Sequence, residues 1–422
     1  MNTPKISVCF FVHKIVNIIQ NNINRYIKEV SMKKLSLTLI IVLLVAFMVV
    51  SNMLSGMQVS ALSEHNITAK SYVVLDKNGK VLIEKNMNEK REVASICKLM
   101  TTLLTFEEID KGNIALDDYI VASEYACAVE GSQAFLDANK EYKVRDLLKS
   151  VVVASANDSA IVLAENIAGN EKDFVKLMND RAKELGMQNT VYANSTGLSS
   201  SAMQQYSTCL DTAIILNKVS EYDLYQEYSQ IWMDKLIHPS GRETELVNTN
   251  RLIKYYPYCK TGKTGFTDEA GYCLSSTAFK DNLKLTCVVL GSNSSANRFT
   301  DSVALYSNAY SNFASERVIC KDEIIGNNIN VLKGQSEHIE VKYAEDFYLT
   351  VNKRNKENYQ VVCDYYDTIA APVNIGDKVG VANVIVGEEI VGRVDLISNT
   401  QVNRQTYKNI VNKIIDRVSI VK

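Results

Sequence analysis

Strand-like segments lie far apart in this 422-residue chain, and their separation by a helical middle restricts the fold more than any other feature. Residues 71–86 alternate in polarity around turn-forming residues at 76–79 and predict a β-hairpin, while 271–292 predicts a second hairpin that turns at 280–282. Apolar residues recur at helical spacing elsewhere, and the predicted helices occupy about 96–109, 144–152, 159–168 and 299–313. We therefore expect an α/β (α+β) fold, with an antiparallel sheet assembled from distant parts of the chain and covered by helices.

The pattern changes from about residue 318, where short alternating runs are separated by Gly, Asn and Asp turns. These runs predict a small all-β domain at 318–400. Within 401–422, apolar residues form one helical stripe opposite basic residues. This stripe fits either a helix lying on a membrane surface or a terminal helix docked on the β domain. The expected organisation is a leader at 1–61, a large α/β domain at 62–317, the β domain and the terminal helix.

The leader has the features of an export signal. Two lysines after Met32 precede an apolar run at 35–50, and small residues at 59–61 resemble a cleavage site. The run is shorter than the roughly 20 residues of a membrane span. We therefore expect cleavage after Ala61 rather than a retained anchor, with Met32 as the true start. The mature protein is expected at the outer face of the cytoplasmic membrane or in the cell wall.

Composition argues against several classes of function. The formal charge of −2 lacks the basic surplus that is typical of nucleic-acid-binding proteins. The four histidines include no HExxH pair, which argues against a zinc hydrolase, and they offer little to a Ser/His/Asp enzyme. Nine cysteines are scattered singly without a CxxC pair, so we expect most of them to be buried small apolar side chains.

The first motif that can carry chemistry is SxxK at Ser95 and Lys98, in the first turn of the helix predicted near 96–109. Residues three apart share a helix face, so the amine can reach the hydroxyl. A serine needs a neighbouring base, and lysine serves as one only where its surroundings favour the neutral amine. Two further copies, at 31–34 and 419–422, lie in the leader and at the end of the chain and are not expected to line a cleft.

The second motif is SxN at Ser155 and Asn157, where the helical pattern breaks. A hydroxyl and an amide on a loop between two helices could relay a proton and hold a substrate carbonyl. The same tripeptide recurs at 295–297, where a turn leading into the next helix is the better interpretation.

The third motif, Lys-Thr-Gly, occurs at 260–262 and again at 263–265. On a strand beside a cleft, a lysine and a threonine can bind a carboxylate, and glycine lets substrate approach the backbone. The alternative is a polar turn before a strand. We prefer Lys263, Thr264 and Gly265 because a strand-like run follows them directly.

In this order, the three motifs resemble the signature of penicillin-binding proteins and class A β-lactamases. Surrounding segments such as VASICKLMTTLL and GKTGFTDEAGYCLSSTA are most similar to the D-alanyl-D-alanine carboxypeptidases, the low-molecular-mass penicillin-binding proteins. The resemblance covers about 67–313, extends more loosely to about 398, and implies a transpeptidase-like fold with a helical subdomain. Val93, where the family commonly has proline, and Gln205, where it often has histidine, depart from the pattern in positions that affect loop geometry rather than the reaction.

The resemblance implies that 62–317 is a catalytic domain in which Ser95 is acylated and Lys98 is its general base. Ser155 would help to pass a proton to the leaving D-alanine. The backbone amides of Ser95 and Phe266 would form the oxyanion hole, which stabilises charge that develops in the transition state.

The substrate would be a peptidoglycan stem peptide ending in D-Ala-D-Ala, and β-lactams would be covalent inhibitors. Asn157 would orient the substrate amide, while Lys263 and Thr264, followed by Gly265, would bind the terminal carboxylate. The resemblance implies neither a cofactor nor a metal. A β-lactamase and a catalytically silent cell-wall binding module of the same fold are the alternatives. The absence of a segment resembling the glutamate-bearing loop of class A enzymes disfavours the first, and intact motifs disfavour the second.

Overall fold

The computed structural model describes residues 20, 67–199, 204–408, 411 and 415. The predicted signal peptide, including Met32 and Ala61, and much of the predicted helix at 401–422 lie outside the described residues, as do the SxxK copies at 31–34 and 419–422. In the part that is described, no helix combines the length and apolar character that a membrane span requires.

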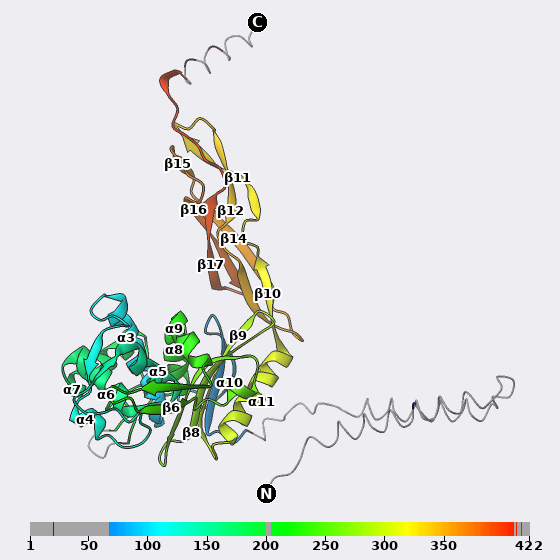
Figure 1. The fold of residues 1–422 in the computed structure, drawn as a ribbon. Coiled ribbons are helices and arrows are strands. Elements are labelled where there is room, and N and C mark those ends of the chain that lie inside the picture. The colour runs from blue at the N-terminus through cyan, green and yellow to red at the C-terminus, as the bar shows by residue number, and fades with distance from the viewer. Residues whose placement is uncertain (1–19, 21–66, 200–203, 409–410, 412–414, 416–422) are drawn as a thin grey trace, which may run out of the picture. The chain divides into compact units, whose positions relative to one another are not determined.

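The central sheet is antiparallel and joins strands from both ends of the large α/β region (Figure 1). Its order in the described residues is β2-β1-β9-β8-β7. The strands are β1 (Ser71–Asp76), β2 (Val81–Lys85), β7 (Cys259–Thr267), β8 (Gly271–Lys280) and β9 (Leu283–Ser292). β1 pairs with β9 from Ser71 opposite Leu290 to Asp76 opposite Leu285. This long-range pairing confirms the predicted sheet built from distant parts of the chain.

Turn chemistry accounts for the two predicted hairpins. The Asp76 carboxylate accepts the backbone N–H groups of Asn78 at 2.8 Å and Lys80 at 2.9 Å, and Gly79 has a φ of +85°. Asp281 and Asn282 connect β8 to β9 with φ values of +51° and +61°. Two consecutive positive φ angles are typical of the tight turn that best matches the twist of an antiparallel hairpin.

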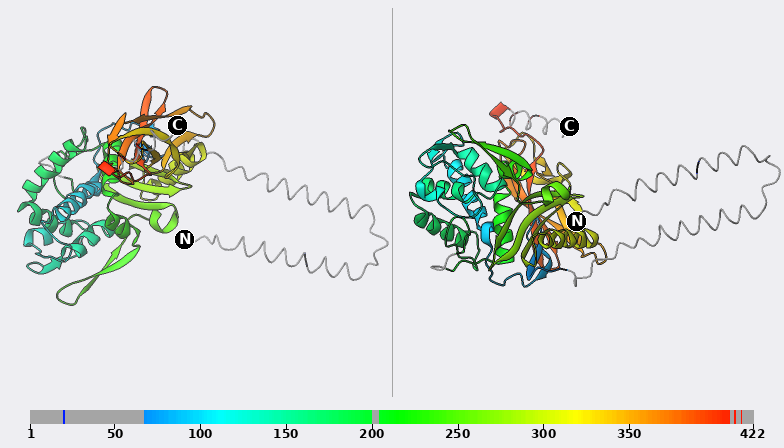
Figure 2. Two further views of the ribbon diagram at one scale, coloured as in Figure 1. Left: turned by 90° about the horizontal axis from the view of Figure 1, so that it is seen from above. Right: turned by 60° about the horizontal axis from the view of Figure 1, so that its bottom comes forward.

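Alternation along the strands divides the core into two layers. Val73 and Val288 face a core shared with the larger helical group. Val74 and Val289 face the opposite side, where they pack with Leu305 and other residues of α11 (Asn297–Asn312). The ribbon views in Figure 2 show α11 on one side of the sheet and the larger helical group on the other. Since neighbouring strand residues point to opposite faces, one sheet supports helices on both sides.

The larger helical group carries or surrounds the motif residues. Its elements are the 3-10 turn η2 (Ala94–Cys97) and the helices α3 (Lys98–Asp110), α4 (Glu124–Cys127), α5 (Val144–Val153), α6 (Asn157–Ala168), α7 (Glu171–Glu184), α8 (Cys209–Val219) and α9 (Asp223–Gln230). The short helix α10 (Leu252–Tyr255) instead buries Leu252 on the face of the sheet that α11 covers. Two short ladders pair β3 (Tyr119–Val121) with β4 (Glu141–Lys143), and β5 (Met233–Ile237) with β6 (Glu243–Val247).

From Phe313 to Ser398 the chain is built from strands, as predicted for the β domain. A two-stranded ladder pairs β10 (Phe313–Ile319) with β13 (Phe347–Asn352), and a larger sheet has the order β14-β16-β17-β12-β11-β15 within the described residues. The strands of the larger sheet are β11 (Ile324–Leu332), β12 (His338–Tyr343), β14 (Tyr359–Tyr365), β15 (Thr368–Ala370), β16 (Lys378–Val386) and β17 (Glu389–Ser398). The boundary predicted between residues 317 and 318 falls inside β10.

Candidate active site

The SxxK motif straddles the start of α3. Ser95 lies in the 3-10 turn η2 rather than in the first turn of an α-helix, and Lys98 is the first residue of α3. Side chains three apart eclipse one another in a 3-10 turn, and Lys98 Nζ lies 2.9 Å from Ser95 Oγ. Ala94, just before the serine, has a φ of +49°. A non-glycine residue in this region costs on the order of 1–3 kcal/mol, which surrounding contacts must offset.

Burial gives Lys98 the property that a lysine base needs. Its side chain is buried, and besides Ser95 it contacts the backbone carbonyl of Thr196, with Nζ and the oxygen 2.6 Å apart. Desolvation lowers the pKa of Lys98 from 10.5 to about 8. The neutral amine is therefore populated near neutral pH, where it can accept the proton of Ser95.

Ser155 and Asn157 lie at the junction of α5 and α6. Ser155 has a φ of +63° and forms the bend, and its Oγ accepts a hydrogen bond from Lys263 Nζ at 2.7 Å. Asn157 is the first residue of α6 rather than a loop residue. Its Nδ2 donates to the Glu130 carbonyl at 2.6 Å, and its buried Oδ1 has no partner in the described part of the chain. A free buried amide oxygen is available to accept a substrate N–H.

Both Lys-Thr-Gly copies lie on β7, an edge of the central sheet in the described residues, and not in a turn. The run after the second copy is not a single strand, because β7 ends at Thr267 and β8 begins at Gly271. Lys263 is buried and reaches Ser155, whereas Lys260 is exposed. Thr264 Oγ1 donates to Thr249 Oγ1 at 2.8 Å.

Gly265 brings the SxxK turn against β7. A Cβ at this position would lie 2.3 Å from the Val93 carbonyl oxygen and 3.3 Å from Ala94 Cβ. The backbone of Val93 thus occupies the space beside Gly265, where the sequence analysis predicted that substrate would approach. Phe266 follows with an exposed side chain that stacks on Tyr272, with ring centroids 4.4 Å apart.

Basic side chains are concentrated around these residues. Burial lowers the pKa of Lys263 well below its usual value, and the nearby cations Lys98 and Arg298 lower it further. Arg298, on α11, also donates from Nη1 to the Gly265 carbonyl at 3.2 Å. Sequence reasoning missed Arg298 because the SxN copy just before it, at 295–297, was interpreted only as a turn leading into a helix. That copy does lie at the start of α11.

A loop from Glu130 to Asp137 is fixed against the SxN residues. Next to Asn157, the Asp158 carboxylate accepts the backbone N–H groups of Ala134 at 2.9 Å and Leu136 at 3.1 Å. Because Asn157 binds the same loop through Glu130, the loop and the start of α6 are held together at several points.

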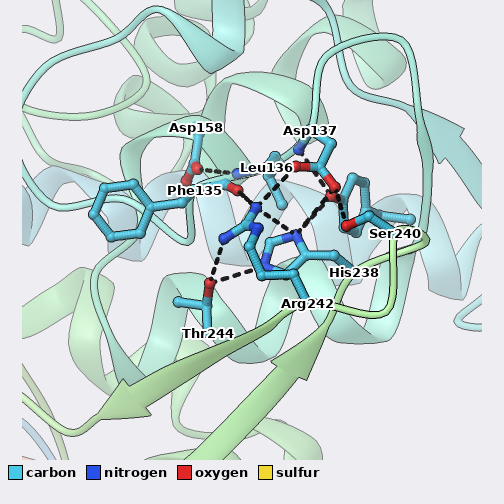
Figure 3. Close-up of polar contacts among 9 residues, drawn as sticks. Phe135, Leu136, Asp137, Asp158, His238, Ser240, Arg242 and Thr244 are labelled. Carbon is cyan, nitrogen blue, oxygen red and sulfur yellow. Dashed lines mark hydrogen bonds and ion pairs between the residues drawn. The ribbon is translucent and has the colours of Figure 1, made fainter.

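The turn between β5 and β6 holds the far end of this loop (Figure 3). Arg242 donates to Asp137 Oδ1 at 2.9 Å and also to the Phe135 carbonyl. The buried His238 contacts Tyr142 through Nδ1 and Thr244 through Nε2, each at 2.8 Å. This histidine therefore belongs to a cluster of hydrogen bonds that holds the loop in place.

The cysteines of the described residues are free, and five of the eight are buried. Cys97, between Ser95 and Lys98, is one of these, and burial raises the pKa of its thiol to about 12. At neutral pH the thiol is protonated and behaves as a small apolar side chain, as the sequence predicted.

Comparison with known proteins gives a consistent result over most of the chain. The family model described as D-alanyl-D-alanine carboxypeptidase matches residues 57–294, and the model described as penicillin-binding protein 5, C-terminal domain, matches 313–404. The chain is 36% identical over 314 residues to the D-alanyl-D-alanine carboxypeptidase DacF of Bacillus subtilis, covering 74% of this chain and 80% of that protein.

Solved structures show the same likeness. Penicillin-binding protein 5 from Haemophilus influenzae aligns with a TM-score of 0.64 and 26% identity, covering 80% of this chain and 98% of that one. A peptidoglycan synthesis regulatory factor (PBP3) from Streptococcus pneumoniae aligns with a TM-score of 0.71 and 25% identity, covering 80% of this chain and all of that one.

Proposed function

Since this chain belongs to the D-alanyl-D-alanine carboxypeptidase family, we propose that Ser95 is the nucleophile with which it removes the terminal D-alanine of peptidoglycan stem peptides. The observation that carries this role is the contact between Ser95 Oγ and the buried Lys98 Nζ at 2.9 Å, together with the lowered pKa of that amine. A hydroxyl beside a partly neutral amine is an activated nucleophile.

In the proposed reaction, Ser95 Oγ bonds to the carbonyl carbon of the penultimate D-alanine while its proton passes to Lys98 Nζ. The backbone amides of Ser95 and Phe266 stabilise the resulting oxyanion. The C–N bond then breaks, and the leaving amine takes a proton through Ser155. Water hydrolyses the ester, which releases the shortened peptide and restores the serine hydroxyl. Asn157 holds the substrate amide through its free Oδ1.

The positive side chains beside Ser155 suit the carboxylate that ends the substrate. Lys263 and Thr264 are the proposed carboxylate ligands, and Arg298 adds positive charge next to them. An anion close to Lys263 favours its charged form, so substrate binding would raise the pKa that burial lowers. Gly265 contributes by admitting the SxxK turn beside these two residues.

Labelling with a fluorescent penicillin tests the assignment. The carboxypeptidase should retain the label and release D-alanine from a D-Ala-D-Ala peptide, a β-lactamase should label and rapidly clear, and a silent module should not label. Ser95→Ala should abolish both labelling and D-alanine release. Intact mass, followed by location of the modified peptide, checks the nucleophile directly, and persistent labelling of Ser95→Ala would overturn the assignment.

We also propose that the protein is exported and that 1–61 is removed, because of the signal-like pattern around 32–61. A proposed catalytic domain at 62–317 and β domain at 318–400 would then act in the cell wall or at the outer face of the membrane. The terminal helix at 401–422 would contact the membrane surface, with docking on the β domain as the alternative. The N-terminal sequence of the mature protein, and vesicle binding with and without 401–422, test these proposals.

A further inference from the structure

We propose that Glu171 is a positioning residue for the base of the reaction, acting through the backbone of Ser195 and Thr196. It touches neither Ser95 nor Lys98 in any contact of the described residues. The inference rests on the proposed function, because it assigns Glu171 a part in preparing Lys98 to accept the proton of Ser95.

The first step is the direction in which the Lys98 amine points. A neutral amine has two N–H groups and one lone pair, and only the lone pair can accept the serine proton. The Thr196 carbonyl oxygen lies 2.6 Å from Lys98 Nζ and accepts one of its N–H groups. The second contact of Nζ is with Ser95 Oγ, at 2.9 Å. The carbonyl of Thr196 thus fixes the rotation of the amine and leaves its lone pair available to Ser95.

The position of the Thr196 carbonyl depends on how the segment 194–197 packs against the residues that carry Ser95 and Lys98. Thr196 belongs to the segment 194–197, and the Ser195 carbonyl beside it accepts a hydrogen bond from Thr101 Oγ1 on α3 at 2.8 Å. Gly197 has a φ of +81°, and a Cβ there would lie 2.0 Å from the Ala94 carbonyl oxygen. The segment therefore packs directly against the turn and the helix that carry Ser95 and Lys98, so a small displacement changes the geometry of the pair.

The segment 194–197 is attached to α7 through Glu171. Glu171 Oε1 accepts both the backbone N–H of Ser195 at 2.9 Å and its hydroxyl at 2.6 Å. Glu171 Oε2 accepts the Tyr125 hydroxyl at 2.8 Å. Hydrogen bonds to a carboxylate are short and strong, and Glu171 lies in the first turn of α7, where the helix dipole favours a negative charge.

The test compares Glu171→Ala with a matched control, Glu165→Ala, in the full chain. Glu165 also accepts a hydroxyl hydrogen bond, from Ser123 at 2.7 Å, but among the described residues its side chain forms no hydrogen bond with 194–197. The measurement is the rate of acylation by a fluorescent penicillin as a function of pH, with thermal unfolding recorded for each variant.

For Glu171→Ala we expect the plateau rate at high pH to fall roughly 10- to 100-fold, because a displacement near 1 Å at a reacting group has an effect of that size. We also expect the midpoint of the pH profile to move to lower pH, because the Thr196 carbonyl favours the charged form of Lys98. For Glu165→Ala, the plateau rate should stay within about threefold of the wild-type rate, and the midpoint of the pH profile should be unchanged. Glu171→Gln, which keeps an acceptor oxygen, should fall between wild type and Glu171→Ala.

An unchanged plateau and midpoint in folded Glu171→Ala, relative to Glu165→Ala, would refute the inference. If Glu171→Ala does not fold, Ser195→Ala and Glu171→Gln decide the matter, since each weakens the same link and should lower the plateau. Failure of the proposed function is a different result: the wild-type protein would then not be acylated at Ser95 at all.

Discussion

Acylation of Ser95 should follow the titration of Lys98. Desolvation lowers the pKa of this amine from 10.5 to about 8. A change of this size favours the neutral amine by about 3 kcal/mol. With this pKa, about one-tenth of the protein holds a neutral base at pH 7 and about nine-tenths does so at pH 9. The acylation rate should therefore rise about tenfold over this range and level off above it.

An unshifted lysine predicts a different profile. With a pKa of 10.5, the neutral fraction would rise about a hundredfold between pH 7 and pH 9 without levelling off. Stopped-flow acylation by a fluorescent penicillin, with fixed ionic strength, separates the two profiles. Lys98→Arg is the control, because an arginine remains charged throughout and should not support acylation. A rate that is flat from pH 7 to pH 9, or that is still rising steeply at pH 9, would refute the argument from burial.

Two further predictions concern packing and stability. Gly265→Ala should reduce acylation by roughly 100-fold or more, because its Cβ would lie 2.3 Å from the Val93 carbonyl oxygen and displace the turn carrying Ser95; an unchanged acylation rate would contradict this packing. Burial, and then the charge of Arg242, lower the pKa of His238 below 6.5, so the unfolded chain binds its proton more readily. This contribution to stability is present above pH 6.5 and is lost as the pH falls below it. The melting temperature should therefore fall more between pH 7 and pH 5 in the wild type than in His238→Gln, and parallel plots of melting temperature against pH for the two proteins would contradict the argument.

Local patterns account for the parts of the fold that could be predicted. Turn-forming residues between alternating runs predicted both β1–β2 and β8–β9, because the turn and its flanking strands are neighbours in sequence. β7 was not predicted in full, since its lysines and glycines are poor strand formers and its pairing with β8 supplies what the local sequence lacks. The ladders β3–β4 and β5–β6 were also missed, because three to five residues carry little periodicity.

In the candidate site, the sequence alone determined the types of the motif residues and their spacing. It also determined that Lys98 can reach Ser95, because residues three apart on a helical turn are close in space. Only the tertiary structure decided that Lys98 is buried and that its amine contacts the carbonyl of Thr196, 98 residues further along the chain. The same is true of the contact between Lys263 and Ser155, which are separated by 108 residues. Burial and electrostatic surroundings depend on which distant segments pack together. The pKa of a side chain, and therefore its chemistry, cannot be obtained from its sequence neighbours alone.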